Sequence, residues 1–579
     1  MIRPHFFMIQ QQWTYKPFDE AMVKTIADEF NLPPLIAKVM ALRGIINREQ
    51  SRHFFFPDRD KLHSPFLMKD MEKAVIRLHE QIESGNGIVV FGDYDVDGTS
   101  GTSLLYLFLK SVGVEVHYYI PDRENEGYGL SKKGIEYAQY IGANLLITCD
   151  CAINAFAQID YANELGVDVI ITDHHKPDEK LPKAFAILNP NRFDCDYPFK
   201  GLCGAGVAFK FALAYCEKYG KDPELVWEHS DLAAIATAAD LVPIVDENRI
   251  IVQDGIKRIS AGAKPGVQAL LKTGGLWGKE VTVGRLVFWF SPKINAAGRL
   301  GDAGRAVKLL TTKNSIYAME VAKELEREND RRKEITQQMV EEAIMMVNGT
   351  CDLEKDNAIV LAKKGWHHGV VGIVASRIKE LYYKPTIIIG IDDNGGRGSC
   401  RSIPKFDMVD ALAQCKEYLN GFGGHPIAAG LSIDTDKVDD FKQALLAVAN
   451  KQIKAEQLQP RLKIDSEMKL TEINGRFLKF LSSLEPYGPG NMRPIFAAKQ
   501  VKVEGLPRLI GKSYDTLKFM VKHDQSIFEV IGFNMAEHYE KLIRNEPIDI
   551  AFAIGENEWN GRKTIQLELK DIKLGGVNA

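Results

Sequence analysis

The sequence predicts an α/β protein of several domains, with a parallel-sheet domain in its first half and a β-barrel near its end. The chain has 579 residues, whereas a single hydrophobic core stops growing near ~250–300 residues. Between residues 80 and 305, short apolar runs alternate with helical segments, which is typical of a parallel sheet. Between residues 460 and 573 the pattern turns to several short strands, which indicates a small barrel.

Three apolar runs in the parallel-sheet region end in acidic or histidine side chains. They are residues 87–91, which lead into GDYDVDG at 92–98, residues 144–150, and residues 167–173, which precede His174 and His175. Ligands of open α/β sheets bind in the crevice outside the carboxyl ends of the strands. We therefore expect these side chains to meet in one crevice, with helices at 99–112 and 156–166 between the strands.

A fourth acidic residue, Asp240, follows a run of small apolar residues. This run predicts a helix from about residue 231 that Pro243 ends. A lone carboxylate after so apolar a segment would be costly to bury without a partner. We therefore place Asp240 with the acids at the strand ends.

The residue types expected in this crevice favour a divalent metal centre. Carboxylates with one or two imidazoles and no thiolate suit hard or borderline cations such as Mg²⁺ or Mn²⁺. Bridging carboxylates can hold two such ions about 3.5–4 Å apart. The candidate ligands are Asp93, Asp95, Asp97, Asp150, His174 and Asp240. For Asp97, directly before Gly98, the alternative is a helix N-cap or a turn former, and the metal-ligand interpretation is favoured over it.

Asp173 and His175 are expected to act beside the metals. Asp173 could bind a metal, but an acceptor that orients His174 is its more natural role. His175 is too close to His174 in the chain for both to face one metal with ease. We expect His175 to face the phosphate, as a hydrogen-bond donor or an acid, and assign both residues to catalysis.

The motifs GDYDVDG, DCAIN, DHH and AADLVPI occur in this order and resemble the four motifs of the DHH phosphoesterase superfamily. Three further segments extend the resemblance to the bacterial single-strand-specific 5′→3′ DNA exonucleases of that superfamily. These segments are EGYGLS at 126–131, PKINAAGR at 292–299 and EPYGPGN at 485–491. One departure is Ala152, where the family usually carries glycine. We expect a small local effect because Asp150 is intact.

The resemblance implies the domain order of the family. A helical, aromatic-rich segment precedes a DHH catalytic domain, a long connecting helix, a smaller α/β DHH-associated domain and an OB-fold barrel. The expected bounds are 1–79, 80–305, 306–351, 352–452 and 453–579, in that order. The charged segment at 312–348 independently predicts a helix, and the apolar runs at 357–362 and 385–390 predict strands of the second α/β domain.

Two glycine-rich segments, 395–402 and 423–430, are predicted to be loops that approach phosphate. Glycine lets backbone N–H groups approach an anion, and arginine offers a fork of donors to phosphate. By the resemblance, the residues that hold the substrate are Asn295, Arg299, Ser399, Arg401 and His425. Arg299, Ser399 and Arg401 would form a pocket for the terminal 5′ phosphate, and His425 would contact a phosphate near the metals.

Tyr128 is a candidate for stacking on a base of the substrate. Proteins that bind single strands commonly stack bases on aromatic side chains. A buried tyrosine whose hydroxyl is satisfied fits the sequence about as well.

Composition limits the class of protein. The 73 basic and 77 acidic residues give a net charge of −4, which argues against a generally basic surface but allows a local basic groove. Eight cysteines without regular spacing favour reduced thiols in a cytoplasmic protein. No apolar stretch reaches the length of a membrane span, and the first residues lack a signal-peptide core.

The leading hypothesis is a metal-dependent exonuclease that degrades single-stranded DNA from its 5′ end to 5′-mononucleotides, in DNA repair and recombination. The resemblance implies single-strand-binding protein and a RecQ-type helicase as partners, and a monomer is the default. One alternative is a phosphoesterase for short oligonucleotides, cyclic dinucleotides or pyrophosphate, against which the C-terminal barrel argues. Another is a non-catalytic scaffold in a replication complex, against which the intact acids argue.

Overall fold

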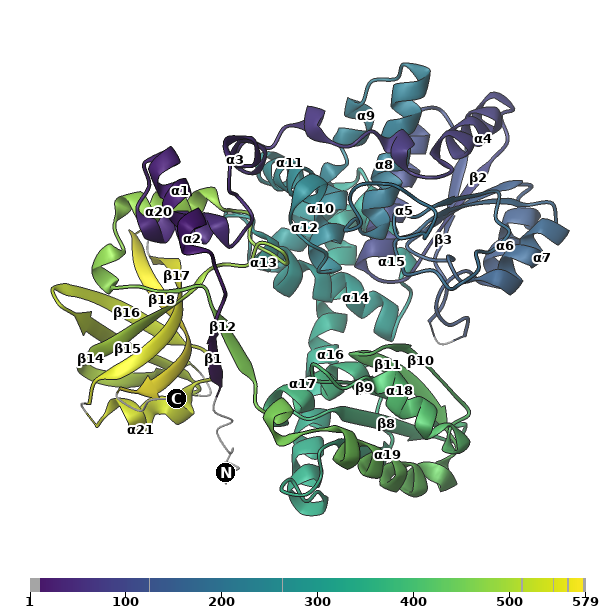
Figure 1. Ribbon diagram of the computed structural model, residues 1–579. Coiled ribbons are helices and arrows are strands. Elements are labelled where there is room, and N and C mark those ends of the chain that lie inside the picture. Colours follow the sequence, from purple (N-terminus) through teal and green to yellow (C-terminus); the bar gives the residue numbers. More distant parts are fainter. Residues whose placement is uncertain are drawn as a thin grey trace. The chain divides into compact units, whose positions relative to one another are not determined.

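The computed structural model describes residues 11–123, 125–262, 264–511, 514–544, 546–559 and 562–575 (Figure 1). The chain forms two compact units. The catalytic unit contains Arg48–Arg332 and Ser483–Met492, and the second unit contains the residues up to Asn47, Lys333–Ser482 and the residues from Arg493 onward. The division at Asn47 falls inside the expected lead-in segment, and the catalytic unit includes a short segment from far along the chain.

A five-stranded parallel sheet forms the centre of the catalytic unit, as the alternating pattern predicts. Its strands are β2 (Ile88–Gly92), β3 (Val116–Tyr119), β4 (Leu145–Cys149), β5 (Asp168–Thr172) and β6 (Ala186–Leu188). They lie in the order β3-β2-β4-β5-β6, and every pairing is parallel. The order reverses between β2 and β4, which is where ligands of such sheets bind.

Helices cover both faces of this sheet (Figure 1). The helices on the sheet are α4 (Met71–Glu83), α5 (Val96–Ser111), α6 (Lys132–Tyr140), α7 (Phe156–Glu164) and α8 (Gly204–Tyr219). The unit also contains α10 (Ser230–Ala239), α11 (Asp246–Gly262), α12 (Pro265–Thr273), α14 (Ser291–Leu300) and α15 (Gly304–Thr311). Val90 of β2 packs into the core with α4, α5 and α8, whereas its neighbour Val89 packs with α6 and α7. Strands buried on both faces explain the nearly continuous apolar runs.

Helix α5 begins at Val96, three residues before the predicted start at 99. Asp95 is its N-cap, and the Asp95 carboxylate accepts a hydrogen bond from the Gly98 N–H at 3.0 Å. The prediction missed these residues because it started the helix at the first hydroxyl residue, whereas an aspartate is an equally good cap. As a result Asp97 lies in the first turn of α5.

A 36-residue helix, α16 (Ser315–Thr350), connects the catalytic unit to the second unit and confirms the predicted long helix. At 1.5 Å per residue it is roughly 54 Å long. Residues up to Arg332 belong to the catalytic unit and residues from Lys333 to the second.

The smaller α/β domain has a mixed sheet, and the prediction of a glycine-rich loop at 395–402 is wrong. The sheet has the order β10 (Gly421–His425), β11 (Ala428–Ile433), β9 (Gly395–Arg401), β8 (Thr386–Asp392) and β7 (Ile359–Lys364). Residues 395–401 are therefore a strand, whereas 423–430 span the end of β10, a turn at 426–427 and the start of β11. A Cβ at Gly396 or Gly398 would lie 2.9 Å from the side chain of Ile433 or Leu431, so these glycines make room for bulky neighbours. Helices α17 (Val371–Tyr382), α18 (Met408–Gln414) and α19 (Val438–Gln452) complete the domain.

The C-terminal region forms the expected barrel. Its strands are β14 (Ile495–Ile510), β15 (Thr516–His523), β16 (Ser526–Gly532), β17 (Ile548–Trp559) and β18 (Arg562–Leu574). They pair in the order β14-β15-β16-β18-β17, and the pairing of β17 with β14 closes the five-stranded barrel.

The N-terminal residues are not entirely helical. Helices α1 (Glu20–Phe30), α2 (Pro34–Ala41) and α3 (Arg48–Phe55) follow a short strand, β1 (Gln12–Tyr15). Strand β1 pairs in parallel with β12 (Arg461–Ile464), a partner too remote in sequence for local periodicity to indicate.

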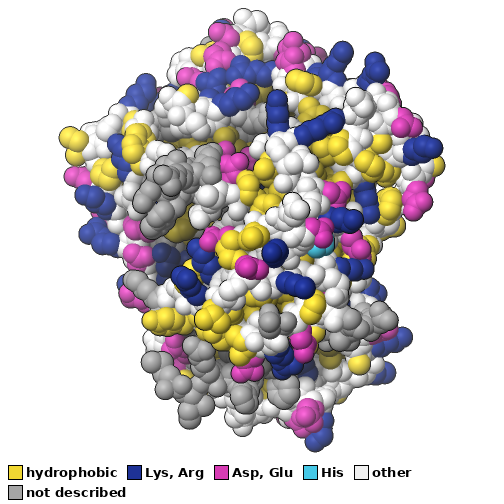
Figure 2. Space-filling view, turned by 90° about the vertical axis from the view of Figure 1, so that its left-hand side faces the viewer, with side chains coloured by type: hydrophobic (Ala, Val, Ile, Leu, Met, Phe, Trp, Pro, Cys, Tyr) yellow, Lys and Arg dark blue, Asp and Glu magenta, His cyan; other side chains and the backbone are white. Residues whose placement is uncertain are grey.

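Basic and acidic side chains are interspersed over the face shown in Figure 2, which agrees with the small net charge. Within the described residues, no helix is both long and apolar enough to cross a membrane.

Candidate metal centre

Three acids lie at the same edge of the parallel sheet because the strand ladder continues just past the strand ends. The Asp93 N–H donates to the Cys149 carbonyl at 3.3 Å and the Asp150 N–H to the Thr172 carbonyl at 2.9 Å. The Asp173 N–H donates to the Leu188 carbonyl at 3.1 Å in the same way. Asp93, Asp150 and Asp173 are all buried.

Asp97 reaches a neighbouring helix rather than capping its own. Its carboxylate accepts hydrogen bonds from the Gly204 N–H at 2.6 Å and the Ala205 N–H at 2.8 Å, at the N-terminus of α8. The positive end of the α8 dipole stabilises this buried negative charge. The N-cap role that the sequence allowed for Asp97 belongs to Asp95.

Close backbone packing fixes Asp150. Its φ is +63°, and a Cβ at Gly204 would lie 2.5 Å from the Asp150 Cβ. Ala152, two residues on, has a φ of +86°. Alanine at such an angle is strained, which gives a physical reason for the glycine that the family usually carries there.

His174 lies among three carboxylates. Its Nε2 is 3.2 Å from Asp150 Oδ1, 3.6 Å from Asp240 Oδ2 and 3.8 Å from Asp97 Oδ2. Asp240 caps the C-terminus of α10 and so approaches from another helix. The structure thus brings all six candidate ligands together.

Three groups of three residues could each hold a metal ion. One of them, Asp150, His174 and His175, shares Asp150 with one of the other groups and His174 with the other. In the group of Asp93, Asp95 and Asp150, the candidate ligand atoms all lie within 4.8 Å of one another. The same holds for the group of Asp97, His174 and Asp240. The latter two groups share no residue, and the short distance between Asp150 and His174 joins them.

The charges in this cluster are unbalanced. Burial, and after it the neighbouring carboxylates, raise the pKa of Asp93 and Asp150 well above the usual range. The same two causes raise the pKa of Asp240 to about 8. Among the described residues, Asp93 Oδ1, Asp150 Oδ1 and His174 Nε2 are buried without a hydrogen-bond partner. A bound cation would satisfy these atoms, and oxygen-rich donors fit Mg²⁺ or Mn²⁺.

Asp173 contacts the ring of His175, whereas the sequence pointed to His174. Its carboxylate accepts hydrogen bonds from the backbone N–H groups of His174 at 2.7 Å and His175 at 3.1 Å, and from that of Ile153 at 3.0 Å. His175 Nδ1 lies 2.8 Å from Asp173 Oδ1. Burial alone would raise the pKa of Asp173, but the bonds from His175 lower it, so Asp173 accepts and Nδ1–H donates.

Tyr128 lies beside His175. Its hydroxyl is 3.3 Å from His175 Nε2, while 58% of the side chain is exposed. The hydroxyl of Tyr128 therefore lies at the acid cluster while its ring is accessible. The sequence also allowed a buried tyrosine at this position, and the exposure of the side chain argues against that alternative.

Helix α14 carries Asn295 and Arg299 close to the same cluster. A Cβ at Gly298 would lie 2.8 Å from the Tyr94 carbonyl, between Asp93 and Asp95 in the chain. The charge of Arg299 also acts on the Tyr94 hydroxyl, where it opposes the effect of burial on the pKa. Both residues are partly buried.

The other predicted substrate residues lie in the second unit. The Arg401 guanidinium donates to Ser399 Oγ at 2.9 Å and to Ser376 Oγ at 3.1 Å. Burial lowers the pKa of Arg401, and this side chain forms no ion pair with any residue that the structure describes. Gly372 in the first turn of α17 lies against it, since a Cβ there would be 3.0 Å from Arg401 Nη2. His425 is exposed on β10.

Sequence reasoning missed Ser376 and the N-terminus of α8. Ser376 lies on α17, and no motif links it to Arg401. The small residues Gly204 and Ala205 could have indicated a close backbone approach, since only small residues permit one.

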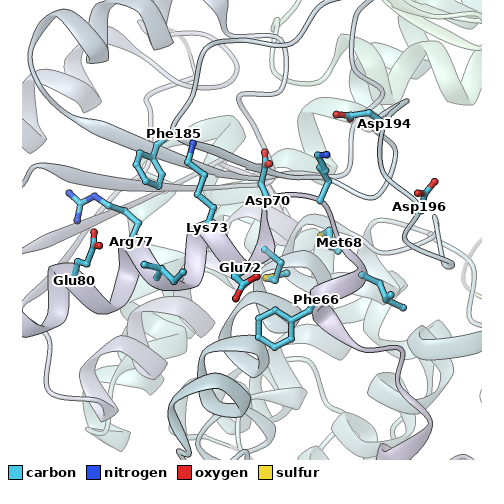
Figure 3. Close-up of a pocket in the computed structure, with 14 residues that line it drawn as sticks. Phe66, Met68, Asp70, Glu72, Lys73, Arg77, Glu80, Phe185, Asp194 and Asp196 are labelled. Carbon is cyan, nitrogen blue, oxygen red and sulfur yellow. The ribbon is translucent and has the colours of Figure 1, made fainter.

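A cavity of about 660 Å³ in the catalytic unit shares no residue with the acid cluster. Both acidic and basic side chains of α4 line it, namely Glu72, Lys73, Arg77 and Glu80 (Figure 3). This mixture favours no single ligand charge, and the chemistry lies at the sheet edge instead.

Family models match three parts of the chain. The DHH family N-terminal domain matches residues 87–237, the DHHA1 domain matches 355–451 and the RecJ OB domain matches 464–571. These matches agree with the parallel-sheet domain, the smaller α/β domain and the barrel.

Similar proteins cover nearly the whole chain. The single-stranded-DNA-specific exonuclease RecJ of Bacillus subtilis is 37% identical over 98% of this chain and 71% of that protein. The Escherichia coli protein of the same name is 34% identical over 93% of this chain and 96% of that protein. The crystal structure of RecJ from Thermus thermophilus in complex with Mn²⁺ superposes with a TM-score of 0.82 at 29% identity, over 98% of this chain and 81% of that one. This chain therefore belongs to the RecJ family of DHH exonucleases.

Proposed function

We propose that this protein hydrolyses single-stranded DNA from the 5′ end, releasing 5′-mononucleotides, with Mn²⁺ or Mg²⁺ at the acid cluster. The observation that carries the proposal is the pair of ligand groups, in which Asp93 Oδ1, Asp150 Oδ1 and His174 Nε2 are buried without a hydrogen-bond partner among the described residues. RecJ structures in complex with Mn²⁺ and with Mg²⁺ support the choice of ion.

In this proposal the two groups hold one ion each. Asp93, Asp95 and Asp150 form one set of ligands, and Asp97, His174 and Asp240 form the other. Bound ions of this kind lower the pKa of a water molecule and stabilise the charge that develops at phosphorus. The α8 N-terminus holds the Asp97 carboxylate in place through two N–H groups.

His175 would position the scissile phosphate. Because Nδ1–H donates to Asp173, Nε2 is left to face the site as a hydrogen-bonding group toward a phosphate oxygen. The Tyr128 hydroxyl lies on the same side, and its exposed ring is available to a base.

Recognition of a terminal phosphate would set the 5′→3′ polarity. The Arg401 guanidinium is partly buried and donates to two serine hydroxyls, an arrangement suited to binding an anion. Ser399 shares this site, and Asn295, Arg299 and His425 are the other residues expected to contact the strand. An exonuclease that must hold a terminal phosphate cannot begin in the middle of a strand.

The family also supports the proposal that the protein acts in the cytoplasm as a monomer with single-strand-binding protein and a RecQ-type helicase. The barrel would extend the track for the single strand, since OB-folds commonly bind single strands.

Labelled substrates test this proposal. Single strands labelled at the 5′ or the 3′ end, a blunt duplex and a dinucleotide are each incubated with the protein and Mn²⁺. We expect immediate release of the 5′ label as mononucleotide, late release of the 3′ label and little turnover of duplex. Early release of the 3′ label, or turnover of dinucleotide alone, would contradict the proposal.

A further inference from the structure

The segment with the sequence EPYGPGN, residues 485–491, forms a tight turn in the catalytic unit. The Gly488 N–H donates to the Asn491 carbonyl at 3.1 Å, and the Asn491 N–H donates to the Gly488 carbonyl at 2.9 Å. Pro489 and Gly490, with a φ of +75° at Gly490, occupy the central positions that favour proline and glycine in a type II turn. The residues before and after Ser483–Met492 belong to the second unit, so only this short segment of the C-terminal part of the chain belongs to the catalytic unit.

Two buried side chains hold the segment in place. Arg249 of α11, 2% exposed, donates to the carbonyls of Leu484 at 3.1 Å and Glu485 at 2.7 Å. Asn491, 1% exposed, donates through Nδ2 to the carbonyls of Leu484 at 2.7 Å and Pro486 at 3.0 Å. Backbone carbonyls that receive such buried donors have little freedom to move.

The turn packs against the loop that follows Asp240. The Ile244 N–H donates to the Pro489 carbonyl at 2.7 Å. A Cβ at Gly488 would lie 2.4 Å from Ile244 Cγ1, and a Cβ at Gly490 would lie 3.2 Å from Pro243 Cβ. The contact leaves no room for a side chain on either glycine.

The Asp240 loop depends on such support. Asp240 is the last residue that α10 orders, as its C-cap, and Leu241 then has a φ of +59°. A leucine keeps a left-handed conformation only where its surroundings impose it. Asn248 Nδ2 donates to the Pro243 carbonyl at 2.9 Å, so α11 holds the loop from one side and the turn from the other.

We propose that the turn at 485–491 is a positioning element that holds the Asp240 carboxylate at the metal centre. The turn acts through Ile244 and the loop, and touches neither metal nor substrate. This inference rests on the proposed function, in which Asp240 is a metal ligand.

Metal binding without DNA provides the test. Calorimetry measures Mn²⁺ affinity for the full chain and for Gly488→Ala, whose new methyl group meets Ile244. We expect about 10-fold weaker Mn²⁺ binding, at the low end of the effect of residues that orient a metal ligand. Fluorescence anisotropy with single-stranded DNA in EDTA should give unchanged affinity, and excess Mn²⁺ should restore most of the turnover.

Two further variants separate positioning from general damage. Gly475→Ala makes the same chemical change at a glycine with nothing within 4 Å of its Cβ, and should bind Mn²⁺ normally. The double variant Gly488→Ala/Ile244→Ala lacks the Ile244 Cγ1 atom that the new methyl group would meet. Because contacting residues couple, its Mn²⁺ affinity should lie within about threefold of that of Ile244→Ala alone.

If Gly488→Ala does not fold, as circular dichroism would show, Asn491→Ser takes its place, because it removes the two Nδ2 bonds without adding bulk. A folded Gly488→Ala or Asn491→Ser protein with unchanged Mn²⁺ affinity would overturn the inference.

Asp240→Asn distinguishes this failure from failure of the proposed function. If Asp240→Asn also binds Mn²⁺ normally, the assignment of Asp240 as a ligand is wrong. If Asp240→Asn weakens Mn²⁺ binding and the turn variants do not, only the positioning role is wrong.

Discussion

The acid cluster of the catalytic unit and the Arg401 site of the second unit both concentrate charge away from solvent, with opposite signs. Carboxylates crowd the first, and Asp93 Oδ1 and Asp150 Oδ1 are buried without a hydrogen-bond partner among the described residues. The second has a partly buried guanidinium that donates to serine hydroxyls. Unpaired charge away from water is costly, so each site favours a ligand of the opposite charge. The comparison indicates a cation site and an anion site, which are the two requirements of phosphodiester cleavage.

The two sites also differ in how the chain builds them. The acids follow the carboxyl ends of parallel strands and the ends of helices, where backbone N–H groups stabilise them. Arg401 lies within a strand and is oriented by Ser376 on α17. The difference shows that a site at the ends of parallel strands can be predicted from sequence, whereas a site built from one strand and a separate helix cannot.

The largest expected effect is on the cation site. Asp150→Ala should lower kcat/KM by more than about 100-fold, because residues that merely support a metal ligand already contribute about 10–100-fold. Binding of single-stranded DNA should be nearly unchanged, since Asp150 holds metal rather than DNA. Steady-state kinetics and anisotropy measure both, with Asp160→Ala on the exposed face of α7 as control. Near-normal turnover of Asp150→Ala would remove the basis of the comparison.

Asp173→Asn tests the hydrogen bond that orients His175 at the acid cluster. The substitution keeps the shape but loses the charge that holds His175 Nδ1–H. We expect a loss of about 10–100-fold in kcat, typical of residues that orient a catalytic or ligating histidine. Mn²⁺ affinity measured by calorimetry should change much less than in Asp150→Ala. An equal loss of Mn²⁺ affinity would mean that Asp173 is itself a ligand.

Arg401→Ala tests the anion site. A hydrogen bond to a charged group contributes roughly 1.5–3 kcal/mol, so the preference for 5′-phosphorylated over 5′-hydroxyl strands should fall by about 10- to 100-fold. Competition kinetics with the two substrates measure this preference. Arg397→Ala, at an exposed arginine of the same strand, should keep it. An unchanged preference in Arg401→Ala would mean that this guanidinium has another function.

The last expected effect is on stability and not on activity, and concerns His229, a buried side chain that is neutral in the folded protein. Among the described residues neither ring nitrogen forms a hydrogen bond, and burial, with the charge of Lys264, lowers the pKa of His229 to about 3 from 6.5. Below pH 6.5 the unfolded chain therefore binds a proton at His229 that the folded chain does not. This difference alone should lower the free energy of unfolding by about 1.4 kcal/mol per pH unit between pH 6.5 and pH 3.

Denaturant unfolding at several pH values measures this slope for the native protein and for His229→Gln, which cannot titrate. The native protein should lose stability more steeply between pH 6.5 and pH 5. Equal slopes would mean that His229 is hydrated in the folded state.

Much of the fold follows from the sequence because its signals are local. The acids of GDYDVDG and Asp150 could be placed at one edge, since parallel strands end together. The strand at 395–401 was missed because glycine ordinarily marks loops, and only the bulk of Ile433 and Leu431 opposite explains the glycines. The pairing of β1 with β12 joins segments that share no local pattern.

Within the site, residue types were predictable but their contacts were not. Whether Asp173 meets His174 or His175 depends on side-chain torsion angles, which the sequence does not specify. The bond of Asp97 to α8 and the packing of 485–491 on the Asp240 loop join elements remote in sequence.

Anomalous diffraction from crystals of this protein soaked in Mn²⁺ tests the central claim most directly. The account predicts two Mn²⁺ peaks about 3.5–4 Å apart. Asp93, Asp95 and Asp150 should bind one ion, and Asp97, His174 and Asp240 should bind the other. Mn²⁺ bound elsewhere, with the acid cluster empty at saturating concentration, would contradict the account.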